Sequence, residues 1–333
     1  MGTHREILKR HRLPIALVAG NLAFASLFMT LALSAFHQPT PHDLKVGVVG
    51  SAPVTRTLQR KLDTAAPGGF ELRAYPSEAQ ARDGIDDRRL DGALITAPRD
   101  PRLLIANAGG SGAARALTSA FTAATAQAGQ HLEVVDVVPP VSGDSQGLSS
   151  FFVILCVLFP SLATGVAAAH LLRHLRPVPR VVVPVVAAVA IGLAAAGIAD
   201  GVSGLGNYLP IAGIVALFSL AISLPTAALG EIKPPLVVLA VLLFLILGLP
   251  VSGGPGGLAP FGPSLLRFFD SALPLGAAAD AVRNTVYFGA HDIGAYLLVL
   301  AAWAVAGVVA LGVATRLNLS RRPENLAAIV PAR

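Results

Sequence analysis

The chain has 333 residues, of which 54% are hydrophobic and only 13% are charged, and its mean hydropathy is +0.67. A soluble domain has about a quarter of its residues charged. A chain with this few charged residues cannot cover a water-facing surface, which indicates a membrane protein. The formal net charge of +6 does not indicate nucleic-acid binding, because the Lys and Arg residues lie at the ends of apolar runs.

The first apolar run covers residues 13–36 and follows the basic segment HREILKRHR. Its end, LALSA, offers the small residues of a signal-peptide cleavage site, which leaves a cleaved signal peptide as the alternative. The run is longer than the roughly 7–15 apolar residues of a signal peptide. We therefore interpret it as transmembrane helix 1, with residues 1–12 as a basic cytoplasmic N-terminus.

Residues 37–147 form one large polar insertion in which short strands alternate with helices. Strands are expected at KVGVVG, FELRAY, GALITA, RLLIANA and LEVVDVVP, and helices at PVTRTLQRKLDT, SEAQARDGIDDRRL and SGAARALTSAFTAATAQAG. Ser77 and Gln80 have the spacing of a capping box at the start of the second helix. The order βαβαββαβ predicts a small α/β sheet with mostly parallel strands, large enough to fold as a unit.

Five further apolar runs approach or exceed the length of about 20 residues that a spanning helix needs. They cover residues 149–172, 178–199, 208–229, 234–250 and 291–315. Lys and Arg concentrate in alternate short loops, which places both termini in the cytoplasm and residues 37–147 outside it. The expected fold is a polytopic α-helical membrane protein with six transmembrane helices and an extracytoplasmic α/β domain between helices 1 and 2. Residues 148–316 form its five-helix membrane domain and residues 317–333 its cytoplasmic tail.

Catalytic and cofactor motifs are not found in the sequence. No P-loop is present, and the Gly-rich stretch GGSGAAR lacks the Lys that such a loop needs. The single cysteine, Cys156, allows neither an internal disulfide nor a zinc site. The expected spans carry no charged residue near their middle, which argues against an ion-coupled carrier. We expect no catalytic residues, no metal and no cofactor.

A break in the apolar pattern precedes the last run. The stretch APFGPSLLRFFDSALPLGAAADAVRNTVYFG contains Asp280 and Arg283, which are three residues apart and can pair on one helix face. Its arrangement resembles the ABC-2 type transporter permeases, in which the connection between the last two spans dips into the outer leaflet. The resemblance implies a re-entrant outer segment at residues 251–290 and an outer gate. In it, Leu273 and Pro274 match a Leu-Pro motif, and Asp280 and Arg283 match an acidic–basic helix. Further gate residues are expected at Arg267, Asp270 and Asn284.

The polar insertion at residues 37–147 restricts this resemblance to one subgroup of the family. GVVG, GGFELRAY, EAQARDGIDDRRLDGALI and DVVPPVSGDSQGLSSFF are similar to actinobacterial members of the phage infection protein (YhgE/Pip-like) subgroup. In that subgroup an acidic junction leads into the second span. Asp144 and Gly147 occupy this place here.

The resemblance implies a plasma-membrane permease subunit of an ABC-type exporter. Such a subunit works with a separate P-loop ATPase, as a homodimer or as a heterodimer with a paralogue, in contact with membrane lipid and without nucleic acid. The uncharged spans predict a lipophilic or amphipathic cargo. One feature departs from the family pattern, because the loop RHLRPVPR is very short for an ATPase-coupling element, and the N-terminal THREILKR could equally be an anchor. The alternative is a non-transporting scaffold or surface receptor that acts through its ectodomain, and an ion-coupled carrier or a membrane enzyme stays open behind it.

Overall fold

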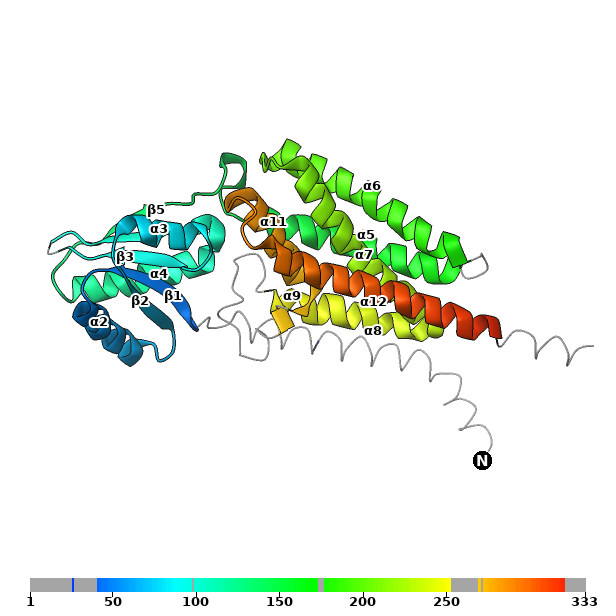
Figure 1. Cartoon of the computed structure of the whole chain (residues 1–333), viewed down its shortest axis with the longest axis horizontal. Coiled ribbons are helices and arrows are strands. Elements are labelled where there is room, and N and C mark those ends of the chain that lie inside the picture. The colour runs from blue at the N-terminus through cyan, green and yellow to red at the C-terminus, as the bar shows by residue number, and fades with distance from the viewer. Residues whose placement is uncertain are drawn as a thin grey trace, which may run out of the picture.

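A computed structural model describes residues 41–97, 99–172, 177–252, 269–270 and 272–320, together with Ser26. Except for Ser26, the predicted first helix at residues 13–36 lies outside these residues. So do residues 253–268 of the predicted re-entrant segment, which include Arg267, and the tail beyond Ser320. In the part that is described, an α/β sheet domain and a helical bundle lie end to end, with the helix α11, at Pro274–Tyr287, between them (Figure 1).

The sheet has five strands in the order β2-β1-β3-β4-β5. Their bounds are Leu44–Val49 for β1, Phe70–Tyr75 for β2, Gly92–Ile95 for β3, Arg102–Ile105 for β4 and Glu133–Asp136 for β5. β1 pairs in parallel with β2 and β3, and β4 pairs in parallel with β5. β3 and β4 are antiparallel and are joined through the predicted PRDP turn. The strand and helix order predicted from the sequence is the observed one.

Three helices cover the two faces of this sheet. They are α2 at Ala52–Ala65, α3 at Glu78–Asp86 and α4 at Ser111–Ala126. Leu62 of α2 and Phe121 of α4 are buried in the core on one face, whereas Ile85 of α3 is buried on the other. Ser77 caps α3, since its Oγ accepts a hydrogen bond from the backbone N–H of Gln80 at 3.3 Å.

Four helices of the bundle are long and apolar enough to cross a membrane. They are α5 at Ser149–Leu171, α6 at Pro177–Ser203, α7 at Tyr208–Ile232 and α12 at Ile293–Ser320. Large aliphatic side chains are exposed along α6 and α12, among them Val186, Val189, Val305 and Val309. An exterior this apolar is suited to lipid, and the membrane class predicted from composition is confirmed at this level.

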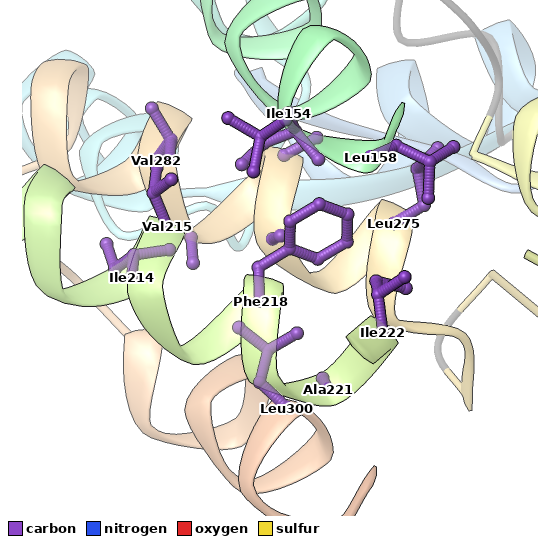
Figure 2. Close-up of a cluster of buried hydrophobic side chains, with 14 of the residues drawn as sticks. Ile154, Leu158, Ile214, Val215, Phe218, Ala221, Ile222, Leu275, Val282 and Leu300 are labelled. Atoms are coloured by element: carbon purple, nitrogen blue, oxygen red, sulfur yellow. The ribbon is translucent and has the colours of Figure 1, made fainter. Parts of the chain in front are cut away.

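Helix α7 is the core of the bundle. In its most apolar stretch 72% of the residues are buried, against 44% in α5, 28% in α12 and 22% in α6. Phe218 of α7 is fully buried and is surrounded by Ile154 and Leu158 of α5, Leu275 of α11 and Leu300 of α12 (Figure 2). The other helices therefore pack around α7.

Glycine allows two neighbours to approach α7 closely. A Cβ atom built on Gly165 of α5 would lie 2.5 Å from the carbonyl oxygen of Ser223, and one on Gly192 of α6 would lie 2.4 Å from that of Ala212. Beside Gly165, Ser161 Oγ donates to Ser219 Oγ at 2.9 Å. Small residues and interhelical hydroxyl bonds are typical of helix contacts in membranes.

The predicted span at residues 234–250 is a broken helical run. It consists of η3 at Pro234–Leu236, α8 at Val237–Val241, the π-helical turn η4 at Leu242–Leu247 and α9 at Gly248–Val251. Its apolar part, Pro234–Leu247, is shorter than the four long helices. A π-helical turn disrupts the regular α-helical hydrogen bonding, and the apolar composition on which the prediction rested does not reveal it. Within the described residues, the structure thus shows four long apolar helices and this broken run where the sequence predicts five spans. The other predicted span, at residues 13–36, lies outside those residues.

The helix α11, at Pro274–Tyr287, lies where the sheet domain meets the bundle (Figure 1). Nearly all of its residues are buried, from Pro274 to Thr285, and it packs against α5, α7, α9 and α12. The sequence pattern is that of an amphipathic interfacial stretch, which would leave one face exposed. Both faces are covered because a residue of the sheet domain, Arg88, and the 3-10 turn η1 at Asn107–Gly109 contact the face that the bundle leaves open.

Candidate functional site

The start of α11 is fixed against the bundle. Leu273 is its N-cap residue and Pro274 its first residue, where a missing N–H costs nothing. The side chain of Leu273 is buried against Leu243, Leu247, Phe269 and Trp303. The indole N–H of Trp303 donates to the carbonyl oxygen of Ala272 at 2.8 Å. This end of the helix is therefore held by α12 and by the broken run.

Asp280 and Arg283 form the predicted pair. Arg283 Nη1 lies 2.5 Å from Asp280 Oδ1, and the side chains of Arg283 and Asp280 are 7% and 24% exposed. Arg283 Nε is buried and makes no hydrogen bond to any residue that the structure describes. A guanidinium held this deep depends on its carboxylate partner, since a buried charge without a partner is costly.

A second cation reaches Asp280 from the sheet domain. Arg88 Nη2 lies 3.8 Å from Asp280 Oδ1, and Arg88 Nη1 donates to the carbonyl oxygen of Gly109 at 2.9 Å. Its guanidinium also lies over the ring of Phe288, 4.9 Å from the ring centre. Arg88 thus joins two loops of the sheet domain to α11. It follows α3 in the charge run DDRR, which gave no indication of this role.

The turn between α11 and α12 is built around Asn284. The carbonyl oxygen of Asn284 accepts from the backbone N–H groups of Phe288 and Ala290, and its side-chain Nδ2 donates to the carbonyl oxygen of His291 at 3.1 Å. Ala290 and Asp292 have the left-handed φ values 60° and 53°. His291 Nδ1 lies 3.6 Å from Asp87 Oδ1, so the turn also contacts the sheet domain.

Asp144 and Gly147 form the predicted junction between the sheet domain and α5. Asp144 is buried in the 3-10 turn η2, Ser142–Asp144, and its Oδ1 accepts from the backbone N–H groups of Leu148 and Ser149 at the start of α5. Its Oδ2 accepts from the hydroxyl of Tyr287 at 2.9 Å, which connects the junction to α11. Burial and the Asp144 carboxylate raise the pKa of the Tyr287 hydroxyl above its ordinary value, so this group remains a donor. Gly147 is in the left-handed region at φ 65°, close to the carbonyl oxygen of Asn107.

Asp270 lies beside α11 and outside the four long helices. Its Oδ1 is so close to Gly276 that a Cβ atom there would have no room. Burial, followed by the Asp280 carboxylate, raises the pKa of Asp270 to about 7, while Arg283 opposes this rise. The predicted gate residues Asp270, Asp280 and Arg283 are thus brought together electrostatically.

A cavity of about 540 Å³ lies between the sheet domain and the α11–α12 turn, and we call it the junction cavity. The sheet domain lines it with Lys45 of β1 and with residues 87–91, and the turn with Asn284, Phe288, His291 and Asp292. Tyr296 of α12 lines it on the side of the bundle. Asn284 Oδ1 is buried and has no hydrogen-bond partner in the described part of the chain.

The sequence pattern did not predict an ion pair that lies at the other end of the bundle. Arg180 Nη1 of α6 lies 2.8 Å from Glu231 Oε1 of α7, and both side chains are less than a tenth exposed. The same guanidinium donates to Thr315 Oγ1 of α12 at 3.2 Å. The sequence places Arg180 and Glu231 at the ends of separate runs, and nothing in their spacing indicates a contact.

Most of the predicted site residues therefore lie in one region. Leu273, Pro274, Asp280, Arg283 and Asn284 belong to α11 and its N-cap, with Asp270 beside it. The junction residue Asp144 joins them through Tyr287. Arg88 and Tyr287 are the members that sequence reasoning missed. Among the residues that the structure covers, no group of His, Cys, Asp or Glu could hold a metal ion.

Comparisons with known proteins add no family or relative. No protein-family model matches the chain, and neither a curated protein nor a solved structure matches it.

Proposed function

We propose that this protein is the membrane permease subunit of an ABC-type exporter for a lipophilic or amphipathic cargo. In this proposal a separate P-loop ATPase supplies the energy, and two copies, or this chain and a paralogue, form the path in the plasma membrane. Both termini are cytoplasmic and the sheet domain is extracytoplasmic.

The observation that carries the proposal is the position of α11. A helix whose Asp280–Arg283 pair is largely buried lies between the sheet domain and one end of the bundle, whose long helices carry Asp, Glu, Lys or Arg only near their ends. A gate needs groups that are stable when paired in the closed state and that water solvates when the helix moves. An ion pair at the membrane interface meets both requirements, because a charge there costs much less than one at mid-depth.

The contacts of α11 also support a coupled movement. Arg88 and Tyr287 connect it to the sheet domain and to the start of α5. A shift of α5 would therefore pull on α11 through Asp144. This is the type of coupling by which an event on the cytoplasmic side could open the outer end.

Affinity purification of the full-length protein from its native membrane in mild detergent, with mass spectrometry of the co-purifying proteins, tests the proposal. We expect a P-loop ATPase in stoichiometric amount. A matched control is an unrelated multi-pass protein with the same tag, purified in the same way. If no ATPase is enriched over that control, the export proposal is wrong.

One observation favours the receptor alternative. A largely apolar cavity of about 580 Å³ lies in the sheet domain between α2 and α4, near the carboxyl end of β3, and is lined by Val54, Lys61, Thr96 and Phe121 among others. Ligands of parallel α/β sheets bind in crevices at the carboxyl ends of strands. Recovery of cell-wall or surface proteins in place of an ATPase in the same experiment would favour this reading.

A further inference from the structure

The junction cavity differs from the other cavities in its charges. Lys45, Arg88 and Arg89 line it with positive charge, and Asp87 and Asp292 line it with negative charge. Asp91 also lines it, but burial raises the pKa of its carboxyl group, which accepts a hydrogen bond from the backbone N–H of Lys45. Groups of both signs in one cavity suit a ligand that itself carries both charges.

Some of these groups are already used within the protein. Arg88 contacts Asp280 and Gly109, and Arg89 pairs with Asp87. In the part of the chain that the structure covers, the ammonium of Lys45, the carboxylate of Asp292 and the hydroxyl of Tyr296 make no hydrogen bond or ion pair. Lys45 comes from the sheet domain and Asp292 from the turn, so the two uncommitted charges are of opposite sign and belong to the two sides of the cavity.

Asn284 points to the chemistry of the missing partner. The residue is 1% exposed, and its Nδ2 is occupied by the carbonyl oxygen of His291, so its unpaired Oδ1 can only accept a hydrogen bond. A buried acceptor without a donor costs about 1–3 kcal/mol. An ammonium group, which donates three hydrogen bonds, would pair with Asp292; Asn284 Oδ1 has no accessible surface and accepts from it only if the Asn284 side chain moves toward the cavity.

The position of the cavity indicates where such a ligand comes from. Asp292 immediately precedes α12, and Tyr296 lies in the first turns of that helix. Leu298, also in the first turns of α12, is 71% exposed on the apolar exterior of the bundle. A head group in the cavity would thus lie at the level of the bilayer surface, with apolar helix surface beside it for acyl chains. The volume of the junction cavity also lies within the range of about 300–1,000 Å³ typical of small-molecule sites.

We propose that the junction cavity binds the zwitterionic head group of a membrane phospholipid. The phosphate lies toward Lys45 and the arginines, and the ammonium lies toward Asp292. Whether the bound lipid is the cargo rests on the export function proposed above, whereas the binding itself does not.

The test uses the full-length protein in detergent and isothermal titration with dihexanoyl phosphatidylethanolamine. Phosphoethanolamine without acyl chains and dihexanoyl phosphatidylglycerol, which lacks the ammonium, are titrated in parallel. We expect the zwitterionic lipid to bind at least tenfold more tightly than either. Lys45→Met and Asp292→Asn should each weaken its binding at least fivefold; both residues are exposed, and Asn tolerates the left-handed φ at position 292. Lys61→Met, in the other cavity of the sheet domain, is the matched control and should leave binding unchanged.

Each other result overturns the inference. Equal binding of the anionic lipid shows that the ammonium is not recognised, and equal binding of free phosphoethanolamine shows that the ligand is not a lipid. Absence of binding, or binding that neither Lys45→Met nor Asp292→Asn weakens, shows that the cavity is not the site. Because no ATPase takes part in this measurement, its failure is distinct from failure of the export proposal, which co-purification decides.

Discussion

The buried ion pair of α11 makes a sharp prediction at the scale of single residues. Asp280→Asn would leave the Arg283 guanidinium without its closest carboxylate in a position that is 7% exposed. Breaking a fully buried pair costs about 3–5 kcal/mol, and the cost here is smaller because the Asp280 side chain is 24% exposed. We therefore expect a clear drop in the thermal unfolding temperature of the protein in detergent. Glu71→Gln removes a carboxylate from the exposed Arg73–Glu71 pair and is the control, because such pairs contribute about 0–1 kcal/mol. Equal stability of the two variants would contradict the buried-pair assignment.

The hydrogen bond from Tyr287 to Asp144 is the second residue-scale prediction. Tyr287→Phe removes only the hydroxyl that donates to Asp144 Oδ2. A hydrogen bond to a charged group contributes about 1.5–3 kcal/mol, and we expect a loss of that size in unfolding measurements. Tyr75→Phe serves as control, since the structure shows no hydrogen bond from the Tyr75 hydroxyl within the described residues. A loss no greater than in the control would mean that the junction is not held by this bond.

The raised pKa of Asp270 predicts that the stability of the protein depends on pH. The pKa of its carboxyl is about 7 in the folded protein and 3.8 ordinarily, so the folded state binds the proton more tightly. The stabilisation from this proton is fully present below about pH 4 and is lost as the pH rises to about 7. The difference in unfolding temperature between wild type and Asp270→Asn should therefore change between pH 5 and pH 8, with wild type losing more stability. A constant difference across this range would count against a neutral, buried Asp270.

At the scale of elements, the close contact between α5 and α7 depends on Gly165, which has no side chain. Gly165→Val would place a Cβ atom 2.5 Å from the carbonyl oxygen of Ser223, so the two helices would have to separate. Overpacking of this kind costs about 1–3 kcal/mol, and we expect at least that loss, measured by thermal unfolding in detergent. Gly213→Val is the matched control, because a Cβ atom at this helical glycine meets nothing within 4 Å. If both variants unfold at the same temperature, close helix approach is not what Gly165 provides.

The elements themselves were largely predictable from the sequence. Local periodicity shows the strand and helix order of residues 44–136, and long apolar runs show α5, α6, α7 and α12. These signals are local, since alternation and apolar length depend on neighbouring residues only. The break at η4 was not predictable in this way, because the run from Leu242 to Leu247 is as apolar as a regular spanning helix.

The site was predictable only in part, for the same reason. The spacing of Asp280 and Arg283 showed that they could pair within one helix. Arg88 reaches that pair across 192 positions of chain, from residue 88 to residue 280, and Arg180 reaches Glu231 from another helix. Contacts of this kind depend on how the elements pack. The burial of α11 likewise follows from its packing between the bundle and the sheet domain and not from its own composition.

At the scale of the whole molecule, charged groups are paired at both ends of the helical bundle, and its middle is apolar. Asp280, Arg283 and Arg88 lie at the end next to the sheet domain, and Arg180 with Glu231 at the other. Glu231→Gln should lower the unfolding temperature strongly, because it removes the carboxylate closest to a buried guanidinium. The double variant Arg180→Met with Glu231→Met should recover most of that loss, since apolar residues of similar size can replace a buried pair. A double variant less stable than Glu231→Gln would show that the pair itself stabilises this end.

The reversal of direction between β3 and β4 has a consequence for the architecture. Because β1 and β3 run one way and β4 and β5 run the opposite way, β1 begins and β5 ends at the same end of the sheet's strands. The two points where the sheet domain joins the rest of the chain therefore lie on the same side of the domain. An evolving chain could acquire, lose or exchange such a domain without changing the path of the chain through the helical bundle. The sheet domain could therefore diverge quickly while the helical part stays the same.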